Sequence, residues 1–190
     1  MIKITDLEFI GQFIVETGKL RVSDPCYDKK TWCSGVIEDV KNGLWEAYVK
    51  LEENENRISE LLIFHKNITK TILKNSIWLE QDIDVGVDSG ICGFFDENYY
   101  PENEKVDSSD VNSFYGKICD IVKNKYYGVI EKGAVSSSGY GDGSYTCHTI
   151  EDKEGIIGAK IVFIEDNEEN GDNEIIDYDN NHDYYFDDYN

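Results

Sequence analysis

Residues 42–51 read Asn42-Gly43-Leu44-Trp45-Glu46-Ala47-Tyr48-Val49-Lys50-Leu51, a turn dipeptide followed by a run rich in aromatic and aliphatic residues. Asn-Gly is strongly associated with tight β-hairpins, because both residues accept the positive φ angles that such turns require. The run 44–51 is typical of a strand. We therefore expect segments 32–40 and 44–51 to pair as a β-hairpin around Asn42-Gly43.

Strands are also predicted on both sides of this hairpin, from apolar runs and period-two alternation. Ser23-Asp24-Pro25 ends the strand predicted at 18–22, because proline donates no ladder hydrogen bond and restricts the residue before it. Two short strands around a turn are expected within 2–15. The other strands are predicted at 57–65, 83–88, 91–96, 129–135, 145–150 and 156–165.

One helix is predicted from Ser109 or Asp110 to about Lys123. A Ser or Asp cap precedes apolar residues whose spacing places them on one face. The fold class expected from these elements is α+β, mainly antiparallel sheet, either sandwich-like or strongly curved, with one principal helix packed on a face.

Length and charge divide the chain into a domain and a tail. The chain has 190 residues and a net charge of −21. A chain of this size buries roughly 70% of the surface that it exposes when unfolded, and we expect one β-rich domain over 1–165. From Glu165 to Asn190 there are eleven Asp or Glu and no Lys or Arg, so residues 1–164 carry a net charge of −10. The segment 166–190 is thus an acidic, Tyr- and Asn-rich tail, whose composition is typical of disorder unless it docks through its aromatic residues.

Charge and cysteine usage restrict partners and location. A surface this negative repels phosphate backbones and anionic lipids, so neither direct nucleic-acid binding nor membrane binding is expected. A neutral small molecule, a cation or a basic protein fits better. The five cysteines contain no Cys-x-x-Cys pair, and no apolar run has the length of a signal or membrane segment, which indicates free thiols in the cytoplasm.

The first candidate site is Cys26, just past the strand that Ser23-Asp24-Pro25 ends. A thiol in such a loop is placed to act as a nucleophile, with His148 as its base if the fold brings the two together. In the alternative, Asp24 and Pro25 shape a turn and Cys26 is a small buried apolar residue.

The second candidate site is Asp84 together with Asp88-Ser89-Gly90. Aspartates four apart on a strand share a face, and Asp24, Asp96 and Asp142 could complete an oxygen site for calcium or magnesium. The spacing does not match an EF-hand. In the alternative, Asp88 caps the glycine turn.

The third candidate site is the loop Ser136-Ser137-Ser138-Gly139-Tyr140-Gly141-Asp142-Gly143-Ser144-Tyr145. Its glycines permit positive φ angles and an anion-binding nest of N–H groups. No lysine and no helix follow, which excludes a P-loop or a Rossmann fingerprint. Asp142-Gly143 favours a specially shaped hairpin turn between two late strands. The candidate ligand-binding residues over all three sites are Asp24, Tyr27, Asp88, Ser89, Gly139, Tyr140, Gly141, Asp142 and Gly143.

Three segments together resemble a known group of small bacterial and phage proteins. The segments are Gly18–Tyr27 (GKLRVSDPCY), Ile83–Asp96 (IDVGVDSGICGFFD) and Ser136–Ile164, which begins SSSGYGDGSY. The group is similar to the domain of unknown function numbered 4241. The resemblance implies an antiparallel β-rich fold in which these loops belong to one module, and it implies no particular chemistry.

The function expected from the sequence is a cytoplasmic binding or interaction module that recognises a small ligand or a protein at these Asp- and Gly-rich loops. Two alternatives stay open. One is a hydrolase that uses Asp24, Asp88 and Asp142 with a divalent cation, or Cys26 as nucleophile. The other is an acidic decoy or immunity-type protein that binds a basic partner through its tail.

Overall fold

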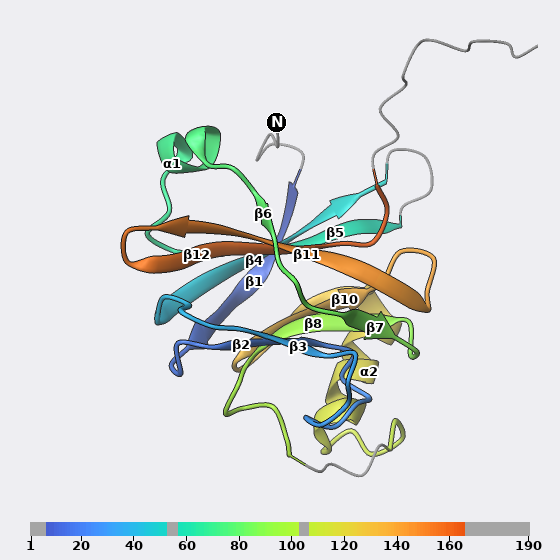
Figure 1. Cartoon of the computed structure of the whole chain (residues 1–190). Coiled ribbons are helices and arrows are strands. Elements are labelled where there is room, and N and C mark those ends of the chain that lie inside the picture. Colours follow the sequence, from blue (N-terminus) through green and yellow to red (C-terminus); the bar gives the residue numbers. More distant parts are fainter. Residues whose placement is uncertain (1–6, 53–56, 103–106, 166–190) are drawn as a thin grey trace, which may run out of the picture.

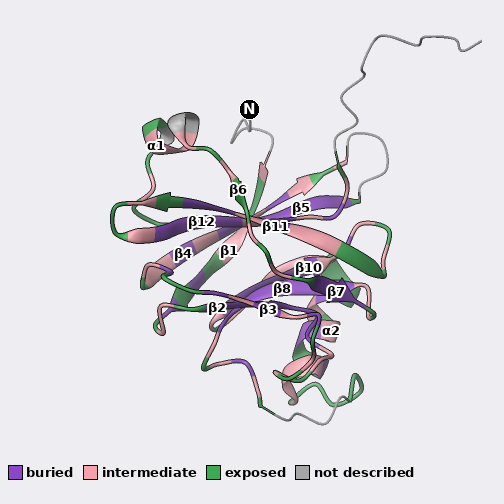
Figure 2. Cartoon of the chain, viewed as in Figure 1, coloured by how far each residue is buried: buried purple, intermediate pink, exposed green. Residues whose placement is uncertain are grey.

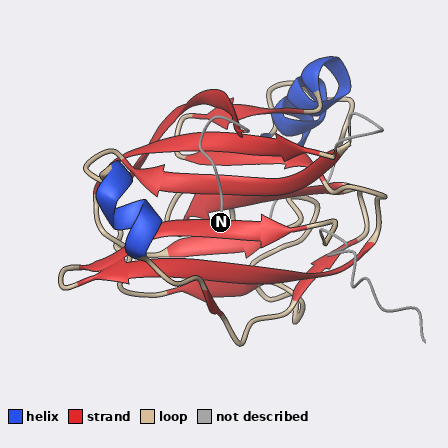
Figure 3. Cartoon of the chain, turned by 90° about the horizontal axis from the view of Figure 1, so that it is seen from above, coloured by secondary structure: helices blue, strands red, loops and turns tan. Residues whose placement is uncertain are grey.

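The computed structural model describes residues 7–52, 57–102 and 107–165 (Figure 1). The expected acidic tail, 166–190, lies outside the described residues. Two antiparallel sheets face each other, and their inner faces enclose the main apolar core (Figures 1 and 3). The α+β, β-rich class expected from the sequence is confirmed.

The larger sheet has seven strands in the order β1-β4-β5-β12-β11-β6, and β7 also pairs with β11. Its strands are β1 (Leu7–Val15), β4 (Gly43–Leu51), β5 (Ile58–His65), β6 (Leu79–Glu80), β7 (Val85–Val87), β11 (Gly143–Asp152) and β12 (Gly155–Val162).

The smaller sheet has five strands in the order β3-β2-β8-β10-β9. Its strands are β2 (Leu20–Ser23), β3 (Gly35–Ile37), β8 (Ile91–Asp96), β9 (Tyr127–Ile130) and β10 (Gly133–Ser137).

Alternation along the strands produces the core between the sheets. In β4, Trp45, Ala47 and Val49 point inward and are fully buried, while the residues between them face outward and are half-buried. The buried residues are concentrated in the strands of the two sheets (Figure 2). A buried methylene contributes about 0.8 kcal/mol, so this continuous apolar layer is the main source of stability.

Each outer face carries a helix. α2 (Phe114–Lys125) packs on the smaller sheet through Ile118 and Val122. It begins later than expected, because Ser113 is the residue that caps it and accepts a 2.9 Å hydrogen bond from the Gly116 N–H. α1 (Lys70–Asn75), which the sequence did not predict, packs on the larger sheet. No helix in the described part of the chain is long and apolar enough to cross a membrane.

The prediction of a hairpin at Asn42-Gly43 is wrong. β3 pairs with β2, whereas β4 pairs with β1 and β5, so the chain crosses from one sheet to the other at this dipeptide. The Asn42 side chain accepts a 2.6 Å hydrogen bond from the Gly18 N–H, and Gly43 has a φ of +133°. Asn42-Gly43 therefore forms a turn, as its residues predict, but this turn connects the two sheets instead of two paired strands.

The prediction of a hairpin at 136–145 is also wrong. β10 belongs to the smaller sheet and β11 to the larger sheet, so this loop is a second connection between the layers. Two smaller expectations also differ. β1 is one bulged strand through Gly11, and the segment around 129–135 forms the β9–β10 hairpin.

Candidate functional site

Three loops from distant parts of the chain meet at one end of the sandwich. They follow β2, join β7 to β8, and join β10 to β11. The Ser138 N–H donates a 3.0 Å hydrogen bond to the Gly90 carbonyl, and the Gly86 N–H donates a 2.8 Å hydrogen bond to the Cys33 carbonyl. We call residues 26–34, 82–90 and 138–144 the loop surface.

Asp24 joins two of these loops with one buried carboxylate. Its Oδ1 accepts hydrogen bonds from the Cys26 N–H (2.8 Å) and the Ser89 hydroxyl (2.7 Å). Its Oδ2 accepts from the N–H groups of Asp88 (2.9 Å) and Ser89 (2.7 Å). Asp24 is 0% exposed. A buried carboxylate requires several donors, and here four satisfy it, so Asp24 positions the loops.

Tyr100 also holds the turn that contains Asp24. It is buried, and its hydroxyl lies 2.7 Å from the carbonyl oxygen of Tyr27 and 2.9 Å from that of Asp24. Burial raises the pKa of Tyr100, so the group is a neutral hydrogen-bond donor. The turn after β2 is thus held by a side chain that follows β8.

The third loop is rigid through its own hydrogen bonds. The Ser138 hydroxyl donates a 2.8 Å bond to the Gly141 carbonyl, and the Tyr145 hydroxyl lies 3.0 Å from the Ser138 carbonyl. Gly139 has a φ of +59°, and a Cβ there would lie 3.0 Å from Phe163 Cβ. Glycine is favoured at this position, because the backbone angle would strain a side chain and its Cβ would crowd Phe163.

The loop surface presents aromatic rings and carboxylates to solvent. Trp32 is 82% exposed and Tyr140 is 64% exposed. Arg57 stacks on the Tyr140 ring at 4.6 Å. The loop surface has five exposed aspartates and one exposed lysine, Lys30. The aspartates are Asp28, Asp82, Asp84, Asp88 and Asp142. Desolvation, together with a hydrogen bond to Asp88, raises the pKa of Tyr27.

The expected pairing of Cys26 with His148 does not occur. Cys147 points into the core, so His148 faces outward from the larger sheet, where its Nε2 lies 3.9 Å from Glu80. Cys26 follows β2 of the other sheet. Burial, followed by hydrogen bonding to Asp24, raises the pKa of Cys26 to about 12. The thiol is therefore protonated at neutral pH, and His148 is not its base.

The aspartates do not gather into a cation site. Within 7–52, 57–102 and 107–165, no three His, Cys, Asp or Glu side chains lie close enough to hold a metal ion. Asp84 and Asp88 flank β7, about 13 Å apart along extended chain. Asp96 lies at the other end of β8, where it accepts from the Glu16 N–H (2.7 Å) and the Thr17 N–H (3.0 Å). Asp142 is exposed.

The structure thus brings together most of the sequence candidates in a role that the sequence did not show. Asp24, rather than Asp88, caps the glycine turn at Asp88-Ser89. Sequence reasoning missed Trp32 and Tyr100. The expected strand 32–40 includes Trp32, which lies in a loop; Asp28 and Thr31 before it are typical of a turn. The chain matches no family model, no curated protein and no solved structure.

Proposed function

We propose that the protein is a binding module that recognises a basic protein through the loop surface. One observation carries this proposal: separate loops are held as one surface that exposes Trp32, Tyr140 and several aspartates. The buried carboxylate of Asp24 joins the first two loops, and the hydrogen bond from the Ser138 N–H to the Gly90 carbonyl adds the third. The proposal narrows the function expected from the sequence to a protein partner.

The chemistry of the loop surface suits a protein partner. Aromatic side chains dominate the binding energy of protein interfaces, and Trp and Tyr are enriched among their hot spots. Exposed carboxylates attract a basic partner and speed its association. Loops that are already ordered lose little entropy on binding. Asp24 is fully buried and already accepts four hydrogen bonds, so it offers no free acceptor to a small ligand.

The family resemblance and the cytoplasmic location belong to the same proposal. The three segments that resemble the domain of unknown function numbered 4241 each contribute a loop to this surface. All five cysteines are free thiols, which fits a reducing compartment.

The test is an affinity capture from a lysate of the native source, with the captured proteins quantified by mass spectrometry. The variant Trp32→Ala/Asp142→Asn removes one exposed ring and one charge from the loop surface. The matched control, Phe9→Ala/Glu151→Gln, removes the same kinds of group from other exposed positions. We expect a basic protein that wild type and control capture equally and that the loop variant captures at least 10-fold less.

Equal capture by the loop variant and the wild type would overturn the proposal. A chain ending at Glu165 distinguishes the tail-mediated decoy. Loss of the basic protein on this truncation alone, with the loop variant unaffected, would assign binding to the tail. Retention by the truncated chain supports the loop surface.

A further inference from the structure

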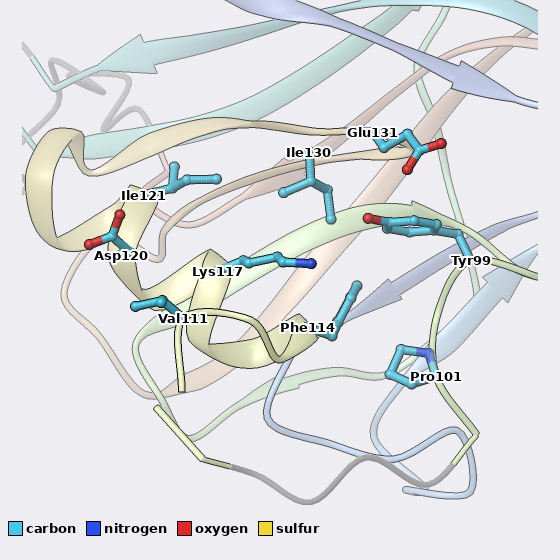
Figure 4. Close-up of a pocket in the computed structure, with 9 residues that line it drawn as sticks. All are labelled: Tyr99, Pro101, Val111, Phe114, Lys117, Asp120, Ile121, Ile130 and Glu131. Atoms are coloured by element: carbon cyan, nitrogen blue, oxygen red, sulfur yellow. The ribbon is translucent and has the colours of Figure 1, made fainter. Parts of the chain in front are cut away.

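A groove beside α2, on the outer face of the smaller sheet, shares no residue with the loop surface. It lies between α2, the β9–β10 hairpin and the chain that follows β8, and its volume is about 630 Å³. This volume falls within the range of small-molecule sites, roughly 300–1,000 Å³. Its walls are mainly apolar and are formed by Pro101, Val111, Phe114, Ile121 and Ile130 (Figure 4).

Two polar groups face the middle of this groove. Figure 4 shows the ammonium end of Lys117 and the hydroxyl of Tyr99 pointing toward the groove from α2 and from the segment after β8. Lys117 makes no ion pair with any of the described residues. An ammonium without an ion pair to the described residues, beside apolar walls, is suited to a single carboxylate.

Two acids at the ends of the groove limit the charge that it accepts. Asp120 points away from the Lys117 ammonium, and its carboxylate oxygen lies 3.4 Å from the Asn124 side-chain nitrogen (Figure 4). Glu131 lies beside Tyr99 (Figure 4). A single negative charge can sit at Lys117, whereas a second one would approach one of these carboxylates. The groove therefore selects against dianions.

We propose that this groove binds a small monocarboxylic acid with an apolar body. The carboxylate pairs with the Lys117 ammonium. The apolar body lies against Phe114, Ile121 and Ile130. The occupant is a free small acid, because the groove has the volume of a small-molecule site.

The test is an NMR titration of the ¹⁵N-labelled full chain with 4-phenylbutyrate, in which the chemical shifts of the backbone amides are measured. The probes 4-phenylbutan-1-ol and 4-phenylbutylamine keep the apolar body and replace the carboxylate by a neutral or a cationic group. We expect saturable shifts at residues 99–101, 111–121 and 130–131 with the acid. Binding of the alcohol and the amine should be at least 10-fold weaker.

Lys117→Met keeps an apolar side chain of similar length and removes the charge. It should weaken 4-phenylbutyrate binding at least 10-fold. Lys123→Met, on the same helix and outside the groove, should leave binding unchanged. Circular dichroism verifies that both variants fold, and the analogue series tests the charge on the unmodified protein.

Three results would overturn the proposal. One is the absence of saturable shifts in the groove. The second is equal binding of the acid and the alcohol, which would leave only apolar contact. The third is tighter binding of an acetylated tetrapeptide with a C-terminal phenylalanine than of 4-phenylbutyrate, which would assign the groove to a protein terminus.

Discussion

Replacing Asp24 by asparagine should destabilise the protein far more than a change of one atom suggests. Each carboxylate oxygen accepts two hydrogen bonds, Oδ1 from Cys26 and Ser89 and Oδ2 from Asp88 and Ser89. In one orientation of an asparagine amide, its NH₂ group faces the two backbone N–H donors of Asp88 and Ser89. In the other orientation it faces the Cys26 N–H, while the Ser89 hydroxyl can turn to accept from it. A buried donor left without an acceptor costs about 1–3 kcal/mol, so we expect the free energy of unfolding to fall by about 3 kcal/mol.

Two comparison variants should cost less. Ser89→Ala removes a single hydroxyl donor and should cost about 1 kcal/mol, the usual net value of one hydrogen bond. Asp142→Asn changes an exposed acid of the loop surface and should stay within about 0.5 kcal/mol of wild type. The order Asp24→Asn, Ser89→Ala, Asp142→Asn follows from the number of donors that each change affects.

The assay is urea unfolding followed by tryptophan fluorescence, which reports on the fully buried Trp45. Free energies are extrapolated to water and compared at equal slopes. An Asp24→Asn protein within about 0.5 kcal/mol of wild type would refute the reasoning, because it would mean that the backbone N–H groups facing the amide find other acceptors. Destabilisation by Asp142→Asn as large as that by Asp24→Asn would refute it as well.

Three further predictions concern the helix, the thiols and a histidine. Gly116→Ala should destabilise the protein by about 2 kcal/mol despite the better helix propensity of alanine, because its Cβ would lie 2.0 Å from the Asp110 carbonyl oxygen; a melting temperature equal to or above wild type would contradict this. Cys26, with a pKa of about 12, should react with iodoacetamide at neutral pH at least 10-fold more slowly than free cysteine, and peptide mapping that shows a free-cysteine rate would be evidence against it. Burial lowers the pKa of His148 from 6.5, so the unfolded chain takes up the proton first and stability falls as the pH drops from about 7 to about 5; His148→Gln should flatten this slope in urea unfolding, and an unchanged slope would assign the effect elsewhere.

The strands were predictable where local pattern alone determines them. β5 and β8 are dense apolar runs between polar loops, and β2 ends where Pro25 requires it. Burial on both faces of β5 leaves no alternative to a central strand. The principal helix was visible from its apolar face, with an error only at its start, where several Ser and Asp residues compete as caps.

The strand pairing was not predictable, because a turn dipeptide reports backbone angles and not the sheet to which the next strand belongs. Asn42-Gly43 has the chemistry of a hairpin, but the Gly18 N–H is the partner of its side chain and the chain changes sheets. Ser136–Tyr145 makes the same kind of connection at the other end of the chain. Both cases depend on contacts between residues far apart in the sequence, which no local window contains.

The candidate site was also predictable only in part: most of its residues were, but their contacts were not. The sequence singled out Asp24, Asp88-Ser89 and the glycine loop, and their proximity was a question that only the fold could answer. The chemistry of Asp24 depends on its burial and on donors 64 and 65 residues away. A carboxylate that could have been a metal ligand is therefore the acceptor for two loops.

Amide hydrogen exchange on the protein, alone and with the captured basic partner, tests the central claim most directly. If the loop surface is the binding site, the partner should slow exchange at residues 26–34, 82–90 and 138–144 and leave β1 and α1 unchanged. Exchange that is unaltered in these loops and slowed elsewhere would contradict the assignment.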